Sequence, residues 1–139
     1  MTPEQVALVL DGVARLRPRL DSTADAFYRD LFECHPELRV MFPDDMSRLR
    51  VKFADELSTI VRAIPDFPAF FEAARALGTR HVGYGVRAAH FAMVRPALLG
   101  AIAAELGEAW TPAMAAAWTA AYDMISEAML LGTLPAART

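Results

Sequence analysis

Three features of the sequence predict an all-α fold. Apolar residues recur at spacings of three and four along most of the chain, which is the period of an amphipathic helix. Prolines and capping residues interrupt these periodic stretches at distances typical of helix ends. No alternating run of β-branched residues is long enough for a strand. We therefore expect helices joined by short turns.

The first helix is expected over residues 3–16. Thr2 can cap its start, Pro3 suits the first helical position, and Gln5 lies where a capping box needs it. Pro18 disfavours helical backbone in the residue before it, so the helix is expected to end there.

A second helix is expected over residues 19–34, where apolar residues such as Leu20 and Phe27 follow the helical period. A His-Pro step ends this helix, and residues 36–41 can form one short helical piece. Residues 42–45 contain a proline and two aspartates, which is typical of a turn.

The clearest amphipathic helix is expected from about Leu49 to Ile64. Its apolar residues recur at helical spacing, while charged residues such as Lys52 and Asp55 occupy other faces. The length and the clean separation of the two faces predict a helix that packs along one side of the core.

A connector and a short helix are expected next. Residues 65–68 contain two prolines, and Phe70 and Leu77 then belong to a helix that runs toward His81. Gly83, with a second glycine two residues later, is expected to stop this helix.

Two final helices are expected over residues 87–106 and 111–131. Thr111 can cap the second of them, and Pro112 suits its first position. Pro96 lies inside the first, and its missing N–H and bulky ring predict a local bend just before it.

Length, charge and cysteine content limit the kinds of protein to consider. The 139 residues suit one domain, 1–139. The net charge of −3 gives no broad positive surface for nucleic acid or an acidic membrane. The longest uncharged run, residues 110–122, contains a proline and is too short to span a bilayer. With no signal peptide and a lone Cys34, we expect a cytoplasmic protein with no membrane partner.

The apolar content of the chain is unusually high. Hydrophobic residues make up 55% of the sequence and the mean hydropathy is +0.24, against about 45–50% apolar residues in typical globular domains. A dense core, an oligomer interface or a cavity for an apolar ligand could each absorb this surplus. The alanine clusters at 101–104 and 115–121 suit close packing within the chain or a homodimer through the last two helices.

Three histidines are the main candidates for metal chemistry, because the sequence lacks phosphate-loop, Cys-x-x-Cys, nucleophile-elbow and zinc-helix motifs. They are too widely spaced to form one zinc site on a single helix. His35 precedes a proline and suits a cap or surface position, and His90 opens a helix and suits the surface. His81 follows Leu77 by one helical turn, and its spacing alone favours a structural role.

Four segments of the sequence, taken together, change that interpretation. Residues 27–32 read Phe-Tyr-Arg-Asp-Leu-Phe, and residues 35–43 contain His-Pro-Glu-Leu and Met-Phe-Pro. Residues 77–86 read Leu-Gly-Thr-Arg-His-Val-Gly-Tyr-Gly-Val, and residues 117–122 read Ala-Trp-Thr-Ala-Ala-Tyr. In this order, the segments resemble bacterial single-domain globins of the Vitreoscilla type and the globin domain of flavohaemoglobins. The resemblance covers essentially the whole chain.

The resemblance implies a globin fold of about six to seven helices around a pocket for haem b, iron protoporphyrin IX. It makes His81 the proximal iron ligand, with its other ring nitrogen held by a backbone carbonyl near Leu77. It also places Lys52 and Arg80 toward the carboxylates of the haem. These assignments follow from the family and not from helical spacing.

The resemblance gives the other cavity residues roles as well. Tyr28 would donate a hydrogen bond to bound gas from the distal side, although a core tyrosine bonded to a carbonyl is the alternative. Phe42 would wedge against the haem, although it could be an ordinary core aromatic. Leu49 and Phe53 would form the distal roof. The residues implied to contact haem are Phe42, Leu49, Lys52, Phe53, Leu77, Arg80, Tyr84, Val86, Phe91 and Tyr122.

The chain departs from the flavohaemoglobin pattern at three positions. Leu49 stands where many of these proteins carry a glutamine that helps to hold the ligand. Phe91 and Thr133 stand where a tyrosine and a glutamate support the proximal histidine. Neither can accept a proton from imidazole as a carboxylate does, so we expect weaker oxygen activation.

The resemblance predicts a globin that reversibly binds dioxygen, and also NO or CO, for carriage, storage or sensing. It favours a gas-binding protein over a dedicated enzyme. The alternative is a nitric oxide dioxygenase or peroxidase-like enzyme that works with a separate reductase, because the 139 residues include no flavin or nicotinamide domain. A second alternative is a globin-like sensor or interaction module that holds no haem.

Overall fold

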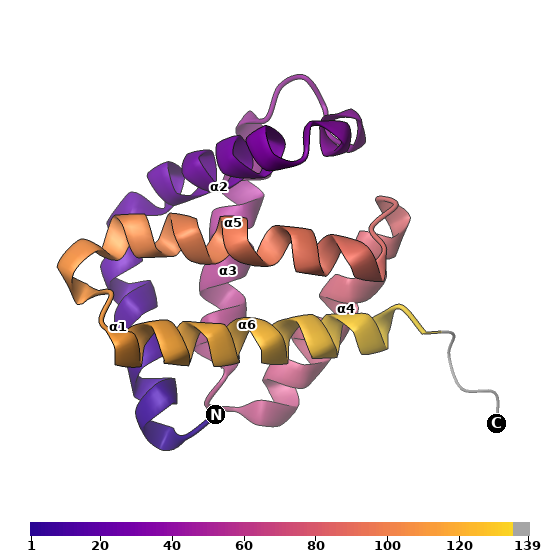
Figure 1. Cartoon of the computed structure of the whole chain (residues 1–139). Coiled ribbons are helices and arrows are strands. Elements are labelled where there is room, and N and C mark those ends of the chain that lie inside the picture. Colours follow the sequence, from indigo (N-terminus) through magenta and orange to yellow (C-terminus); the bar gives the residue numbers. More distant parts are fainter. Residues whose placement is uncertain (135–139) are drawn as a thin grey trace, which may run out of the picture.

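The computed structural model describes residues 1–134, which form helices and no strands (Figure 1). The predicted all-α fold is therefore confirmed for this part of the chain, and residues 135–139 of the expected domain lie outside it. The α-helices are α1 (Pro3–Leu16), α2 (Leu20–Cys34), α3 (Ser47–Ala63), α4 (Phe67–Gly83), α5 (Ala88–Leu106) and α6 (Pro112–Gly132). Short 3-10 segments cover Arg17–Arg19, Pro36–Met41 and Gly107–Ala109.

The helix starts follow the capping chemistry of the sequence. Gln5 N–H donates to the Thr2 hydroxyl at 3.1 Å and Thr2 N–H donates to the Gln5 side chain at 3.0 Å, which completes the predicted capping box. Thr111 caps α6 by accepting a hydrogen bond from the N–H of Met114 at 3.2 Å. Both predicted caps are confirmed.

Helix α4 is longer than predicted. The connector expected over residues 65–68 extends only to Asp66, whose side chain caps the helix by accepting from the Ala69 N–H at 3.4 Å. Pro68 then lies in the first turn, where its missing N–H leaves no helical hydrogen bond unmade. The prediction of a short helix from Phe70 was wrong because this proline starts the helix and does not break the chain.

Helix α5 continues through Pro96. The proline removes the N–H that would bond the carbonyl of Ala92, and the bend predicted from it stays a prediction. Next to it, Arg95 reaches α6 and donates to both carboxylate oxygens of Asp123, at 3.0 and 3.2 Å. This pair attaches α5 to α6 at the point where the proline weakens the helix.

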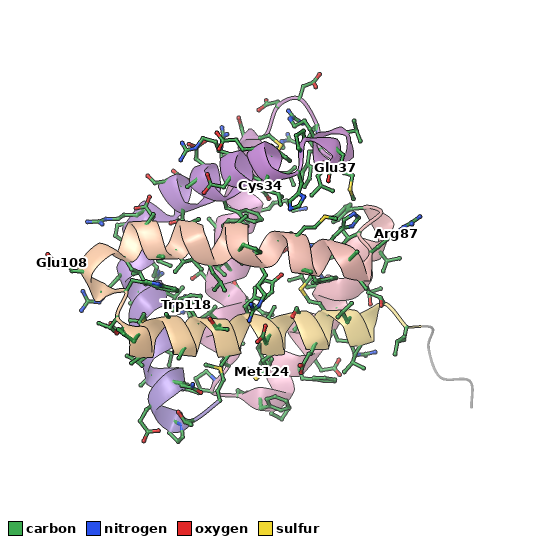
Figure 2. All side chains as sticks on the ribbon, viewed as in Figure 1. Cys34, Glu37, Arg87, Glu108, Trp118 and Met124 are labelled. Carbon is green, nitrogen blue, oxygen red and sulfur yellow. The ribbon has the colours of Figure 1, made fainter. Side chains whose placement is uncertain are left out.

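The helices pack in two crossing sets around a common core. In Figure 1, α5 and α6 run side by side, and α1, α3 and α4 cross behind them, while α2 packs against α5 and α3. The core residues come from all parts of the chain, and Val9, Phe70 and Ile102 are fully buried. Trp118 of α6, labelled in Figure 2, is 2% exposed, and its indole N–H lies so close to Gly12 that α1 has no room for a side chain there.

The backbones of α4 and α6 approach each other closely where the two helices cross. A Cβ atom added at Gly78 would collide with the carbonyl of Met129, and one added at Gly132 would collide with the carbonyl of Arg75. The Thr79 hydroxyl donates a hydrogen bond across this crossing to the Gly132 carbonyl at 2.7 Å. Two glycines therefore let the backbones of α4 and α6 touch.

Some alanines of the last two helices pack inside the chain, whereas others, such as Ala104 and Ala116, are exposed. Ala101, Ala117 and Ala121 are at most 1% exposed. Packing within the chain therefore accounts for these residues, and the homodimer stays a prediction.

Among the described residues, the stretch Ala88–Ala109 is long and apolar enough to cross a membrane. Core helices of soluble proteins meet the same criterion of length and composition. Several of its apolar side chains, among them Phe91, Val94 and Leu98, line an internal cavity. These apolar side chains of α5 therefore form part of the cavity wall.

We predict that Gly78→Ala lowers the free energy of unfolding by about 2–3 kcal/mol, because the new methyl group meets a backbone carbonyl that no rotamer change can move. Urea denaturation measures the change. Gly100→Ala is the matched control, since Gly100 lies inside α5 with open space around it. It should stabilise the protein by about 0.5–1 kcal/mol through helix propensity. Equal effects of the two substitutions would contradict the close crossing.

Candidate functional site

A largely apolar cavity of about 500 Å³ lies among α2, α3, α4, α5 and α6. Its size falls within the range of cofactor and small-molecule sites. The structure brings together at this cavity every residue that the sequence predicted for the site. These are Tyr28, Phe42, Leu49, Lys52, Phe53, Leu77, Arg80, His81, Tyr84, Val86, Phe91 and Tyr122.

His81 is held in one orientation at the end of α4. Its Nδ1 lies 2.8 Å from the carbonyl oxygen of Leu77, one helical turn earlier. A carbonyl only accepts hydrogen bonds, so Nδ1 carries a proton, and in the neutral ring Nε2 then keeps a free electron pair. Because the ring lines the cavity, it offers there a nitrogen suited to coordinate a metal ion. The predicted contact with a carbonyl near Leu77 is confirmed.

The turn after α4 closes the cavity beside His81. The carbonyl of His81 accepts hydrogen bonds from the N–H groups of Tyr84 and Val86, at 3.0 and 3.1 Å. Gly85 has a φ of +84°, a left-handed conformation that favours glycine. The turn places Val86 at the cavity, while Tyr84 stays 57% exposed at its edge with its ring 5.8 Å from that of His81.

Tyr28 lies in an aromatic cluster on the α2–α3 side of the cavity. Its ring centroid is 4.8 Å from that of Phe27, 5.7 Å from that of Phe42 and 5.8 Å from that of Phe53. Burial raises the pKa of the Tyr28 hydroxyl to about 12, and the negative charge of Glu56 adds to the rise. Among residues 1–134 no hydrogen-bond partner is found for this hydroxyl, and none contributes to its pKa, so the alternative of a tyrosine bonded to a carbonyl is not found.

The phenol is therefore a protonated donor at the cavity wall. Phe42 belongs to both the aromatic cluster and the cavity wall. Its position therefore suits a core aromatic and a residue that contacts haem alike. Leu49 and Phe53 line the wall from α3. These apolar side chains line the same part of the cavity as the half-buried Tyr28.

Charged groups lie at the rim of the cavity. Lys52 is exposed there, whereas Arg80 forms an ion pair with Glu56 of α3, at 3.5 Å between nitrogen and oxygen. The sequence analysis expected both cations to be available for a ligand and missed Glu56. The helical spacing could have placed Glu56 at the cavity, because Glu56 follows Leu49 by seven residues and Phe53 by three and so lies on the same face of α3.

His90 also lines the cavity, which the sequence analysis did not predict. Its Nδ1 accepts a hydrogen bond from the N–H of Arg87 at 2.8 Å and so caps the start of α5, where Figure 2 labels Arg87. The proton of a neutral His90 is then on Nε2, the reverse of His81. His90 opens α5, as predicted, and is half-buried, so it lies at the cavity as well as at the surface.

Phe91 and Thr133 differ in their relation to the cavity. Phe91 lines it, and its carbonyl accepts a hydrogen bond from the Tyr122 hydroxyl at 2.6 Å. The Thr133 hydroxyl donates to the Leu130 carbonyl of its own helix at 2.6 Å. Burial raises the pKa of Tyr122 to about 12.

Comparison with known proteins decides the family. The family model described as Globin matches residues 25–129. The chain belongs to the globin family. This match confirms the predicted globin fold for the helices α2 to α6 and the cavity between them.

Two globin relatives illustrate the family. The chain is 34% identical over 131 residues to anaerobic nitrite reductase NSHB5 of Oryza sativa, covering 90% of each protein. It is also 34% identical over 137 residues to the flavohemoprotein of Deinococcus radiodurans, covering 94% of this chain and 33% of that protein. The chain therefore spans about a third of the flavohemoprotein.

Solved globin structures agree with the fold. The engineered carbene transferase RmaNOD from Rhodothermus marinus has a TM-score of 0.82 and 32% identity, over 96% of this chain and 92% of that chain. A bacterial globin from Campylobacter jejuni has a TM-score of 0.85 and 24% identity, over 95% and 96% of the two chains. The predicted resemblance to bacterial globins and flavohaemoglobins is confirmed.

We predict that Tyr122→Phe lowers the free energy of unfolding by about 1 kcal/mol at pH 8, because it removes the hydrogen bond to Phe91. The difference should shrink as the pH rises from 10 to 12. The folded phenol has a pKa of about 12 against 10 when unfolded, so its contribution is full below pH 10 and is lost above it. Urea denaturation at several pH values measures this.

Tyr84→Phe, which removes an exposed hydroxyl, is the control and should change the stability by less than about 0.5 kcal/mol. A constant difference between wild type and Tyr122→Phe from pH 8 to 12 would contradict the assigned pKa.

Proposed function

We propose that this globin binds haem b in the cavity and thereby binds diatomic gases, O2 together with NO and CO, reversibly. The observation that supports this most is the His81 ring, whose Nε2 keeps a free electron pair at the wall of an apolar cavity of about 500 Å³. When bound, haem supplies an iron atom at which such gases bind.

The residues present fit this cofactor. His81 suits the iron, and the Leu77 carbonyl fixes its tautomer and raises the basicity of the ring. The apolar walls suit the faces of a porphyrin. Lys52 and Arg80 at the rim suit its carboxylates, although Arg80 must then divide its hydrogen bonds between a carboxylate and Glu56.

The opposite wall suits the gas. Tyr28 keeps its proton at physiological pH and has no internal partner within residues 1–134, so its hydroxyl is free to donate to a gas molecule in the cavity. Leu49 and Phe53 exclude water from the same region. One neutral hydrogen bond is worth about 1 kcal/mol, which supports reversible binding of moderate strength.

Carriage, storage or sensing of gas in the cytoplasm is the role we propose for this chemistry. Nitric oxide dioxygenation with a separate reductase is the second candidate, because the similar RmaNOD of Rhodothermus marinus is described as a nitric oxide dioxygenase. Phe91 and Thr133, which offer no carboxylate to His81, favour the first role. Consumption of NO over many turnovers with an added reductase would favour the second role.

The first test is haem uptake. Haem added to the apoprotein should give a stoichiometric complex with a Soret band in the wild type, and His81→Ala should lose this band or bind haem at least tenfold more weakly. His35→Ala is the control, because His35 lies outside the cavity beside Glu37. Unchanged haem binding by His81→Ala would refute the ligand assignment, and a wild type that takes up no haem would favour the haem-free module.

The second test concerns the hydrogen bond from Tyr28. Tyr28→Phe should raise the dissociation rate of O2 about fivefold, since about 1 kcal/mol of stabilisation is lost. Leu49→Gln adds a donor to the same wall and should lower that rate. Stopped-flow measurements give both rates. If neither rate changes, the Tyr28 hydroxyl does not reach the gas.

A further inference from the structure

His90 offers a hydrogen-bond donor at the edge of the cavity. Its Nδ1 accepts the N–H of Arg87 at 2.8 Å, and a backbone N–H can only donate, so this nitrogen carries no proton. In this arrangement the ring is neutral and its proton lies on Nε2. Among residues 1–134, no partner is found for this second N–H. His90 therefore presents one oriented donor beside a largely apolar wall.

The hydrogen bonds around the start of α5 determine where this donor lies. His90 occupies the position in the capping box that Glu or Gln usually takes, and the N–H of Arg87 holds its ring there. The turn before α5 is bonded to the end of α4, because the His81 carbonyl accepts hydrogen bonds from the N–H groups of Tyr84 and Val86. The donor of His90 therefore has a defined place relative to the ring of His81.

This place is the boundary between the cavity and the surface. His90 is half-buried, and Tyr84, which lines the same cavity, is 57% exposed. An anionic acceptor suits such a boundary, because a charge-assisted hydrogen bond is stronger than a neutral one and the other lone pairs of the anion stay in contact with water. The anionic acceptors of haem b are its carboxylates.

We propose that His90 binds a carboxylate of the cofactor through its Nε2–H and so fixes the porphyrin relative to His81. The proposal rests on the proposed function, since it concerns the same cavity and the same cofactor. It adds a donor from α5 to the two cations at the rim, Lys52 of α3 and Arg80 of α4. Arg80 divides its hydrogen bonds with Glu56, whereas the Nε2–H of His90 has no competing partner among residues 1–134.

Binding of metal-free protoporphyrin IX to the apoprotein tests the proposal without iron. Its dimethyl ester has the same ring system and no carboxylate, and fluorescence titration measures both affinities. His90→Glu keeps a capping acceptor at the start of α5 but replaces the donor with an anion. It should weaken protoporphyrin binding about tenfold and change the affinity for the ester less than about twofold.

A second variant separates the donor from the cap. His90→Gln keeps a capping acceptor and an amide N–H, so it should weaken protoporphyrin binding by no more than about threefold. Gln5→Glu is the matched control, because it makes the same kind of change in the capping box of α1, outside the cavity. It should leave both affinities unchanged.

The outcomes distinguish this proposal from the proposed function. Equal weakening of the acid and the ester by His90→Glu would mean that His90 acts only through the fold of α5, and would overturn the proposal. Unchanged binding of both porphyrins would overturn it too. A wild type that binds protoporphyrin IX with the expected dependence on His90, but does not coordinate haem iron, would refute the proposed function and support the carboxylate site.

Discussion

The contact between the backbones of α4 and α6 is the constraint on which the site depends. Gly78 and Gly132 lie where any side chain would collide with a carbonyl of the facing helix, and Thr79 donates a hydrogen bond across the same crossing. His81 follows within one turn, so this crossing determines where its ring stands relative to α6. A side chain at either glycine would move α4 outward and carry His81 with it.

The cavity accounts for part of the high hydrophobic content of the chain, which is 55% of its residues. Apolar side chains of α3 and α5, such as Phe53, Val94 and Leu98, face the cavity and are only partly buried. Burial of this apolar surface against an apolar ligand is favourable. A bound cofactor would therefore stabilise the folded state, through these contacts and by mass action.

Two polar side chains of the cavity, His81 and Tyr28, have surroundings that determine which atom carries a proton. His81 carries its proton on Nδ1 because a carbonyl faces that atom, and Tyr28 keeps its proton because burial and Glu56 disfavour the phenolate. Glu56 forms an ion pair with Arg80 at the rim. The cavity therefore combines an apolar wall with an electron-pair donor on α4 and a hydrogen-bond donor on α2.

The sequence by itself determined the helices and much of the site. The period of three and four, the capping residues and the prolines act within a turn or two, so most helix ends follow from local chemistry; Pro68 is the exception, because a proline suits a helix start as well as a break. The contact of His81 with Leu77 is equally local, since the two residues lie four apart on one helix. The resemblance supplied the rest of the predicted wall.

Only the tertiary structure decided the contacts between helices. The pairing of Glu56 with Arg80 and the place of His90 at the cavity depend on how α3, α4 and α5 cross, which no spacing within one helix determines. The need for glycine at Gly78 likewise arises from the carbonyl of Met129, fifty-one residues away. Helical periodicity predicts which side of a helix faces inward. Which residues that side then contacts depends on the packing of the whole chain.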